Sequence, residues 1–240
     1  MGDINYLDGL AYAKTEGQEP CIVFLPGYRS DMEGTKAVHL NAWARERGRA
    51  FLRFDYSGHG RSHGVFEEGS IGAWAADAQK LIKALAPGPV VLVGSSMGGW
   101  IGCILSKRLE LAGFVGIAAA PDFTEDGFWA NLNEEQRQII MQEGQITLPS
   151  SYEDPYILTR NLIMDGRENL VLRTPLRMGC RVRLLQGTQD QSVSRETALR
   201  LLDHIEADDL RLTLVRGADH SFSDEKCLSL IEAAIEEVAP

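Results

Sequence analysis

The sequence predicts an α/β fold, in which a mostly parallel β-sheet is covered by helices on both faces. Apolar runs of strand length alternate along the chain with stretches in which apolar residues recur at helical spacing. In addition, 44% of the 240 residues are hydrophobic and 24% are charged, a balance typical of a folded domain with a sizeable core. We expect residues 1–240 to form a single domain, because this length suits one large α/β unit.

The first part of the chain shows this alternation. Asp8 and Gly9 form a turn signal between short β-like segments and indicate an opening hairpin. Residues 21–25 and 50–54 are apolar runs typical of buried strands. Between these strands, Ser30 and Glu33 have the spacing of a capping box, which predicts that a helix begins there.

The pattern continues in the second half of the chain. Residues 89–93 predict a strand, and the apolar residues Met97, Ile101 and Ile104 behind it predict a helix packed on the sheet. A final helix is expected from about Ser223. Three further strands are predicted, over residues 114–118, 181–186 and 211–215.

The strand rhythm is interrupted over about residues 121–175. This interval is too long for a plain loop in a compact domain, where about 12 to 15 residues is already unusual. We therefore expect an inserted helical lid across the carboxyl edge of the sheet, with one helix between Asn133 and Gly144 and another over residues 156–164. Its inward side chains are expected to be apolar or aromatic: Phe123, Phe128, Trp129, Leu132 and Ile140.

Charge and cysteine usage exclude several classes of function. With 24 Lys and Arg against 34 Asp and Glu, the net charge is −10, so neither a nucleic acid nor an anionic membrane is expected as the main partner. The four cysteines have no metal-ligand spacing, so we expect neither metal nor other cofactor. No apolar stretch suits stable membrane insertion, and no export signal is visible in the first residues. These features predict a cytoplasmic protein.

Residues 94–98 read Gly-Ser-Ser-Met-Gly and lie directly between a predicted strand and a predicted helix. This is the context of a nucleophile elbow, a sharp turn that holds a serine in a strained backbone conformation. Small residues are needed on either side, because side chains at Gly94 and Gly98 would collide with neighbouring backbone. The pattern predicts Ser96 as the nucleophile.

A serine hydroxyl needs a base, and the base needs a carboxylate that orients it. His220 follows the last predicted strand and precedes the last helix, so its loop lies at the same sheet edge as Ser96. Asp190 follows the preceding strand and is our choice of acid. Asp219, next to the histidine, and Asp122, after the strand over residues 114–118, remain alternatives.

The remaining site residues follow from the needs of acyl transfer. The developing oxyanion needs preorganised donors, and the backbone N–H groups of Met97 and Tyr28 are the natural pair. Arg29 lies at the expected mouth of the site, where it would meet a substrate carboxylate. From the insertion, Phe128 and Trp129 are expected to line a pocket for the acyl chain.

Four segments carry a resemblance to a known family: residues 25–37, which read LPGYRSDMEGTKA, residues 54–58, residues 94–100, and Leu148-Pro149-Ser150. The chain resembles the α/β-hydrolase superfamily, and more narrowly its mitochondrial palmitoyl-protein thioesterases that also deconjugate acyl glucuronides. The resemblance implies an α/β-hydrolase fold with Ser96 as nucleophile, Asp190 as acid and His220 as base. It also shows two departures: Gln186 stands where a histidine is common, and Ser221 begins a stretch where an arginine is frequent.

These observations favour a serine hydrolase that needs no cofactor and cleaves an acyl ester or thioester, either on a small molecule or linked to a protein. Fold and triad do not determine the leaving group, so a serine peptidase or a cofactor-free lyase with the same triad is an alternative. A binding protein that has kept the fold without turnover is the third possibility. The sequence makes no prediction of the oligomeric state.

Overall fold

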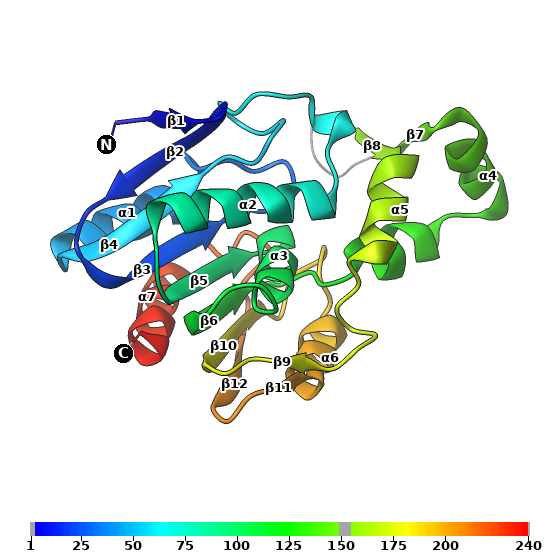
Figure 1. Ribbon diagram of the computed structural model, residues 1–240. Helices are drawn as coiled ribbons and strands as arrows, with labels where there is room; N and C mark the ends of the chain where they lie inside the picture. Colours follow the sequence, from blue (N-terminus) through cyan, green and yellow to red (C-terminus); the bar gives the residue numbers. More distant parts are fainter. Residues whose placement is uncertain (1–2, 149–154, 240) are drawn as a thin grey trace.

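The centre of the computed structural model, which describes residues 3–148 and 155–239, is an eight-stranded sheet (Figure 1). Runs of aliphatic and aromatic residues build its inner strands, which are buried on both faces. In chain order its strands are β1 (Asn5–Leu7), β2 (Leu10–Thr15), β3 (Gln18–Leu25), β4 (Arg49–Phe54), β5 (Val90–Ser95), β6 (Leu111–Ile117), β10 (Arg181–Gly187) and β12 (Leu210–Val215).

The order of the strands determines where the sheet can form a binding crevice. Across the sheet they are arranged β1-β2-β4-β3-β5-β6-β10-β12, and all neighbours from β4 to β12 are parallel. At the other edge, the pairs β1–β2 and β2–β4 are antiparallel. After β3 the chain continues to β4 on one side and then returns to β5 on the other. Such a reversal opens a crevice at the carboxyl ends of the two central strands.

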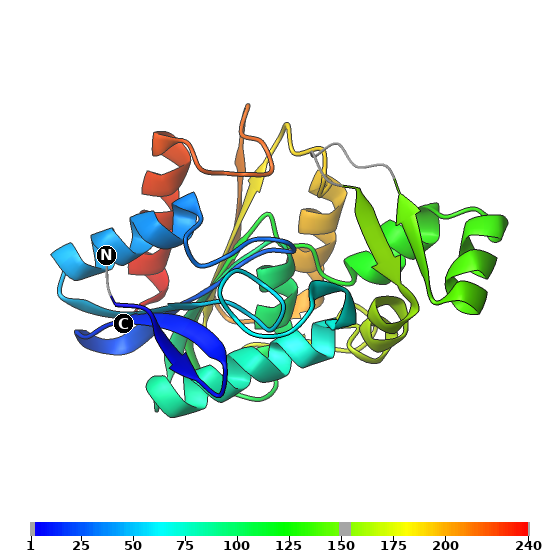
Figure 2. The ribbon, with the colours of Figure 1, turned by 90° about the horizontal axis from the view of Figure 1, so that it is seen from above.

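Helices cover both faces of the sheet, as Figure 2 shows from above. One face is covered by α1 (Thr35–Glu46) and α7 (Glu225–Val238), and the other by α2 (Ile71–Leu85), α3 (Met97–Leu105) and α6 (Arg195–His204). The alternation of side chains along a strand supplies both layers. In β5, for example, Val91 and Val93 pack on the side of α1 and α7, whereas Leu92 packs on the opposite side.

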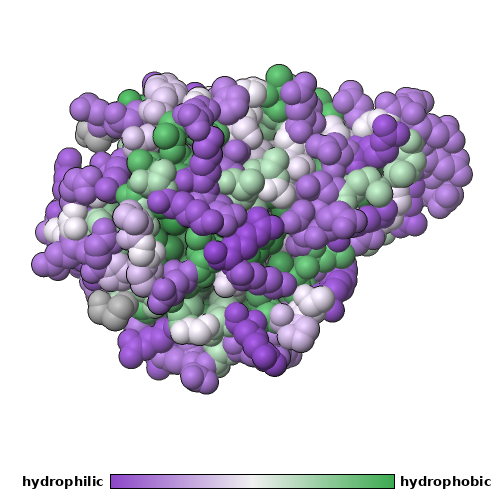
Figure 3. Space-filling model, in the orientation of Figure 1, coloured by the Kyte–Doolittle hydropathy of each residue, from purple (hydrophilic) through white to green (hydrophobic). Residues whose placement is uncertain are grey.

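An insertion projects from the sheet between β6 and β10 (Figure 1). It consists of the π-helix η2 (Phe123–Trp129), α4 (Glu134–Glu143), the antiparallel pair β7 (Gln145–Leu148) and β8 (Tyr156–Thr159), and α5 (Arg160–Glu168). Its outer end is covered mainly by hydrophilic residues (Figure 3). Three minor elements complete the described chain: the short 3₁₀ helix η1 (Phe66–Glu68) and the two-residue strands β9 (Leu176–Arg177) and β11 (Ile205–Glu206).

A buried carboxylate ties the two ends of this insertion together. Asp122, in the left-handed region at φ 57°, accepts hydrogen bonds from the backbone N–H groups of Val171 at 2.8 Å and Leu172 at 3.0 Å. The guanidinium of Arg173 adds an ion pair at 2.9 Å. Because the carboxylate is fully buried, these partners offset its desolvation. One side chain thus fixes where the insertion leaves and rejoins the sheet layer.

The predicted fold class is confirmed, but two local predictions are wrong. Ser30 and Glu33 do not cap a helix, because α1 begins at Thr35 behind Gly34 with no side-chain cap. The intervening residues form a turn instead, in which Asp31 accepts the backbone N–H of Glu33 at 2.8 Å. The turn replaces the expected first helical turn.

The second correction concerns the end of the insertion. Residues 156–159 form β8 rather than the start of a helix, because they pair in register with β7, and α5 begins only at Arg160. A short apolar run is compatible with a strand or a helix, so a partner strand determines which of the two forms. The predicted helix from Asn133 does form as α4, with its capping box. Pro149 and Ser150 lie outside the described residues.

Candidate active site

Ser96 occupies a strained turn between β5 and α3. Its backbone lies at φ 53°, ψ −116°, a conformation that residues other than glycine rarely adopt. The turn is possible because glycines stand two positions before and two positions after Ser96. A Cβ on Gly94 would lie 2.4 Å from the carbonyl oxygen of Gly98, and a Cβ on Gly98 would lie 2.0 Å from that of Leu25. The N–H of Ser96 donates to Ile117 at 2.9 Å. The strained serine is therefore held against the sheet.

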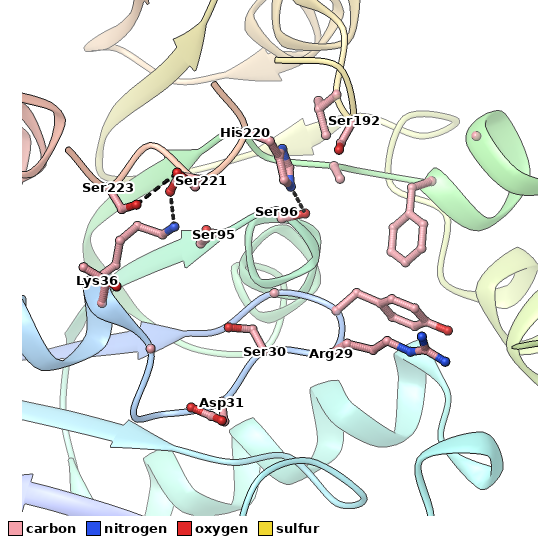
Figure 4. Close-up of a pocket in the computed structure, with 18 of the residues that line it drawn as sticks. Arg29, Ser30, Asp31, Lys36, Ser95, Ser96, Ser192, His220, Ser221 and Ser223 are labelled. Atoms are coloured by element: carbon pink, nitrogen blue, oxygen red, sulfur yellow. Dashed lines mark hydrogen bonds between the residues drawn. The ribbon is translucent and has the colours of Figure 1, made fainter. Parts of the chain in front are cut away.

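Two further predicted residues reach Ser96 from other loops. His220 lies in the loop between β12 and α7, and its Nε2 is 3.2 Å from Ser96 Oγ (Figure 4). On the other side of the ring, Nδ1 is 2.9 Å from Asp190 Oδ2. With the carboxylate accepting from Nδ1–H, Nε2 is left free to accept the proton of the serine hydroxyl. The three side chains thus form one continuous hydrogen-bonded series.

The Asp190 carboxylate is fully buried, and its four hydrogen bonds explain how it remains charged. The backbone N–H groups of Ser192 and Val193 each donate to Oδ1 at 2.8 Å, and Gln186 Nε2 donates to Oδ2 at 3.0 Å beside His220. Burial alone would raise the pKa of Asp190, but the hydrogen bonds from His220, Val193 and Ser192 outweigh it and lower that pKa. The carboxylate is ionised at neutral pH.

The two alternative acids have other partners. Asp219 is exposed and accepts hydrogen bonds from the hydroxyl of Ser221 at 2.8 Å and the backbone N–H of Phe222 at 3.2 Å. Asp122 is committed to the far end of the insertion through Arg173 and two backbone N–H groups. Of the three carboxylates weighed from the sequence, Asp190 is the one that the fold brings to His220.

The two predicted oxyanion donors come from the residue after Ser96 and from the turn after β3. Met97 is the first residue of α3, directly after Ser96. Tyr28 lies in the turn after β3, and a Cβ on its neighbour Gly27 would lie 3.4 Å from Ser96 Cβ and 4.0 Å from Oγ. In residues 3–148 and 155–239, the backbone N–H groups of Met97 and Tyr28 donate to no protein acceptor. The geometry leaves both donors available to a substrate oxygen.

An open pocket of about 840 Å³ surrounds Ser96 and His220. One part of its wall is aromatic and comes from the insertion and the turn after β3. There the ring centres of Phe123 and Phe128 are 5.3 Å apart, and those of Phe128 and Tyr156 are 5.6 Å apart. The other part of the wall is polar and rich in hydroxyl groups, and it contains both an acid and a base: Ser30, Asp31, Lys36, Ser192, Ser221 and Ser223.

The predicted substrate-binding residues differ in their placement. Phe128 lines the pocket, and so does Arg29. The guanidinium of Arg29, however, donates to the carbonyl oxygen of Pro155 at 2.9 Å and stacks over Phe66 and Tyr156. This cation is therefore already engaged with the protein.

The expectation for Trp129 is wrong. Its ring is not part of the pocket wall and lies instead between two guanidinium groups, with Arg167 at 4.4 Å and Arg137 at 5.5 Å from its centre. In a π-helix, with its i→i+5 bonds, Phe123 and Phe128 share one face, and Trp129, the next residue, lies on another. Leu132 and Ile140, also expected to face inward, are buried in the core and do not reach the pocket.

Sequence reasoning missed two residues. Lys36 reaches the pocket from the first turn of α1, although it lies within the segment that carries the family resemblance. Gln186, noted only as a departure from the family, bonds the same Asp190 oxygen as His220. Both are polar residues close to the carboxyl end of a strand, which the sequence shows. Whether such a side chain reaches the pocket depends on the fold.

Two other kinds of site are absent from the described residues. Within the described part of the chain, His, Cys, Asp and Glu form no cluster of three or more that is able to hold a metal ion. None of the helices over the same residues is both long and apolar enough to cross a membrane.

Comparison with known proteins gives the family. Residues 22–239 match the model of the alpha/beta hydrolase family. The chain belongs to this family. A putative hydrolase from Agrobacterium vitis superposes with a TM-score of 0.92 at 36% identity, over 99% of this chain and 97% of that one. Alpha/beta hydrolase domain-containing protein 10 from mouse superposes with a TM-score of 0.88 at 31% identity, over 98% and 97%.

Curated relatives narrow the comparison and correct one expectation. The mitochondrial palmitoyl-protein thioesterase ABHD10 of Bos taurus is 34% identical over 239 residues, which cover 97% of this chain and 77% of the relative. The human protein of the same name is 33% identical over 236 residues, with the same coverage. This α/β hydrolase is thus homologous to proteins named as thioesterases. The predicted cytoplasmic location is wrong, because these names place the relatives in mitochondria.

Proposed function

We propose that this α/β hydrolase is a serine hydrolase that cleaves acyl esters or thioesters through Ser96, His220 and Asp190. One observation carries the proposal: the series of hydrogen bonds from Ser96 Oγ through both nitrogens of His220 to the buried carboxylate of Asp190. A serine hydroxyl becomes a nucleophile when a base accepts its proton, and a carboxylate on the far nitrogen holds that base in the required tautomer.

The reaction proceeds in two halves. Ser96 Oγ attacks the acyl carbonyl carbon while His220 Nε2 takes the hydroxyl proton, and Asp190 stabilises the imidazolium that forms. The backbone N–H groups of Tyr28 and Met97 stabilise the negative oxygen. His220 then returns the proton to the departing alcohol or thiol, which leaves an acyl ester on Ser96. Water attacks this ester with His220 as base, and the free acid is released.

The wall of the pocket supports an acyl substrate. Phe123, Phe128 and Tyr156 present aromatic surface beside Ser96, and burial of a hydrocarbon chain against it contributes about 0.8 kcal/mol per methylene. The names of the curated relatives support a thioester linkage and a protein-linked palmitoyl group as one member of the substrate class. The proposed chemistry uses side chains and backbone alone and needs no cofactor.

Replacement of the nucleophile tests the proposal. Ser96→Ala should reduce kcat for an acyl p-nitrophenyl ester by several orders of magnitude, since only oxyanion stabilisation and binding remain. Ser95→Ala is the matched control, because it removes the neighbouring hydroxyl of the same turn and should keep most of the activity. Retention of half the activity by Ser96→Ala, with a loss in Ser95→Ala, would reject Ser96 as the nucleophile.

A further inference from the structure

The two sides of the pocket differ in chemistry. Figure 4 shows Lys36, Ser221 and Ser223 on one side of Ser96 and Arg29 on the other. The side of Arg29 also carries the aromatic wall, through the stacking of its guanidinium on Tyr156 at 5.6 Å. The side of Lys36 is formed by the start of α1 and by the residues directly after His220. A substrate that spans the pocket therefore meets unlike groups at its two ends.

Lys36 is a cation of the pocket wall that makes no contact ion pair among the described residues. Its partly buried side chain donates a hydrogen bond to the carbonyl oxygen of Ser221. In the part of the chain that the structure describes, no carboxylate lies within ion-pair distance of Nζ. Burial lowers the pKa of Lys36, and the charge of Asp219 only partly offsets this effect. An ammonium has three N–H donors, so a single carbonyl leaves donors unused at the pocket wall.

Hydroxyl groups line the same pocket as this ammonium. Ser221 Oγ and Ser223 Oγ lie 3.0 Å apart, and the hydroxyl of Ser221 also bonds Asp219. Ser30 lines the same cavity from the turn before α1. The second cation of the pocket, Arg29, is already bonded to Pro155 and is stacked on two rings. Arg29 thus belongs to the aromatic side of the pocket, and Lys36 is the cation on the side of the residues that follow His220.

The position next to His220 indicates which part of a substrate meets Lys36. In the proposed reaction His220 must protonate the leaving atom, so the leaving group has to lie within hydrogen-bond reach of Nε2. Ser221 and Ser223 follow His220 directly in the chain and form this wall together with Lys36. The aromatic wall on the opposite side suits the acyl chain.

We propose that Lys36, assisted by the hydroxyls of Ser30 and Ser223, binds a negatively charged group carried by the leaving group of the substrate. This assignment rests on the proposed function, since it presumes acyl transfer to Ser96. It makes Lys36 a specificity residue: it selects among substrates that share one acyl chain and differ in the charge of the alcohol or thiol that departs.

A matched pair of substrates tests this assignment. Two p-nitrophenyl butyrates carry either a carboxylate or a carboxamide at the same ring position, so they differ in charge and little in size. The ratio of their kcat/KM values is measured for the unmodified protein and for Lys36→Met, Lys36→Arg, Arg29→Met and Lys83→Met. Lys83 is exposed on α2, outside the pocket, and its variant controls for the loss of one positive charge.

We expect the unmodified protein to favour the carboxylate ester, and Lys36→Met to lower the ratio about tenfold or more, as for loss of a charge-assisted hydrogen bond. Lys36→Arg should keep part of the preference, and Lys83→Met all of it. A ratio near one in the unmodified protein, an equal fall for both esters in Lys36→Met, or loss of preference only in Arg29→Met would each overturn the subsite. Failure of the folded, unmodified protein to cleave either ester would instead reject the proposed function.

Discussion

The two walls of the pocket are held in different ways. On the sheet side, each side chain of the proposed triad is fixed by specific hydrogen bonds, and Asp190 alone accepts four. On the insertion side, Phe123 and Phe128 are held by ring packing, with centres 5.3 Å apart. Hydrogen bonds at a buried carboxylate tolerate almost no displacement, whereas aromatic packing allows substitution at moderate cost. The proposed chemistry and the proposed contact with the acyl chain thus depend on separate supports.

The largest effect is expected on the sheet side, from the acid. Asp190→Asn should reduce kcat by roughly 10³–10⁴-fold, because an amide in this position favours the wrong tautomer of His220. Asp219→Asn, beside the histidine in sequence, should have a mild effect, since its carboxylate bonds Ser221 and Phe222 instead. Steady-state kinetics on one acyl ester compares the two. The reverse order would show that Asp219 is the acid.

The anchor of the insertion should affect stability more than chemistry. Asp122→Ala removes a buried carboxylate and leaves the backbone N–H groups of Val171 and Leu172 without their acceptor. We expect the free energy of unfolding to fall by about 2–4 kcal/mol, measured by denaturant titration. Asp126→Ala removes an exposed partner of the same arginine and should cost at most about 1 kcal/mol. Equal losses would contradict the anchoring role.

A smaller effect is expected from the aromatic wall. For p-nitrophenyl esters from acetyl to palmitoyl, kept below micelle-forming concentrations, kcat/KM should rise with chain length until the pocket is filled. Phe128→Ala should flatten this rise, because Phe128 lines the pocket. An activity that peaks at acetyl, or an unchanged profile in a folded Phe128→Ala variant, would show that this wall does not bind the acyl chain.

The smallest effect is expected from Trp129. Its ring lies between Arg137 and Arg167 rather than at the pocket, so Trp129→Ala should leave the chain-length profile unchanged. The variant is the matched control for Phe128→Ala, since both remove an aromatic ring from the same π-helix. A change of profile in Trp129→Ala alone would show that the acyl chain contacts the Trp129 face of that helix and not the Phe128 face.

The sheet side of the pocket was more predictable from sequence than the insertion side. The turn at Ser96 was recognisable because the backbone approaches so closely at Gly94 and Gly98 that neither position has room for a side chain, which leaves a local signature. The placement of His220 followed from strand order, because loops at the carboxyl ends of parallel strands share one edge. Both features depend on short-range rules that residue types reveal directly.

Apart from α4, which begins at its capping box as predicted, the insertion depends on contacts that no local pattern encodes. Residues 156–159 become a strand only because β7 is available to pair with them. Phe123 and Phe128, five residues apart, share the pocket face because η2 is a π-helix, to which the α-helical spacing of 3.6 residues does not apply. Asp122, weighed from the sequence as a catalytic acid, is an anchor because the chain returns to it some fifty residues later, at Val171. Tertiary pairing therefore overrides local preference here.

Covalent labelling tests the central claim most directly. A fluorophosphonate reacts with a serine hydroxyl that is activated by a base, and mass spectrometry of the digested protein locates the adduct. The adduct is expected on Ser96 of the unmodified protein, much more slowly formed in His220→Ala, and absent in Ser96→Ala. An adduct on another residue, or no reaction with the folded unmodified protein, would contradict the assignment of Ser96 as an activated nucleophile.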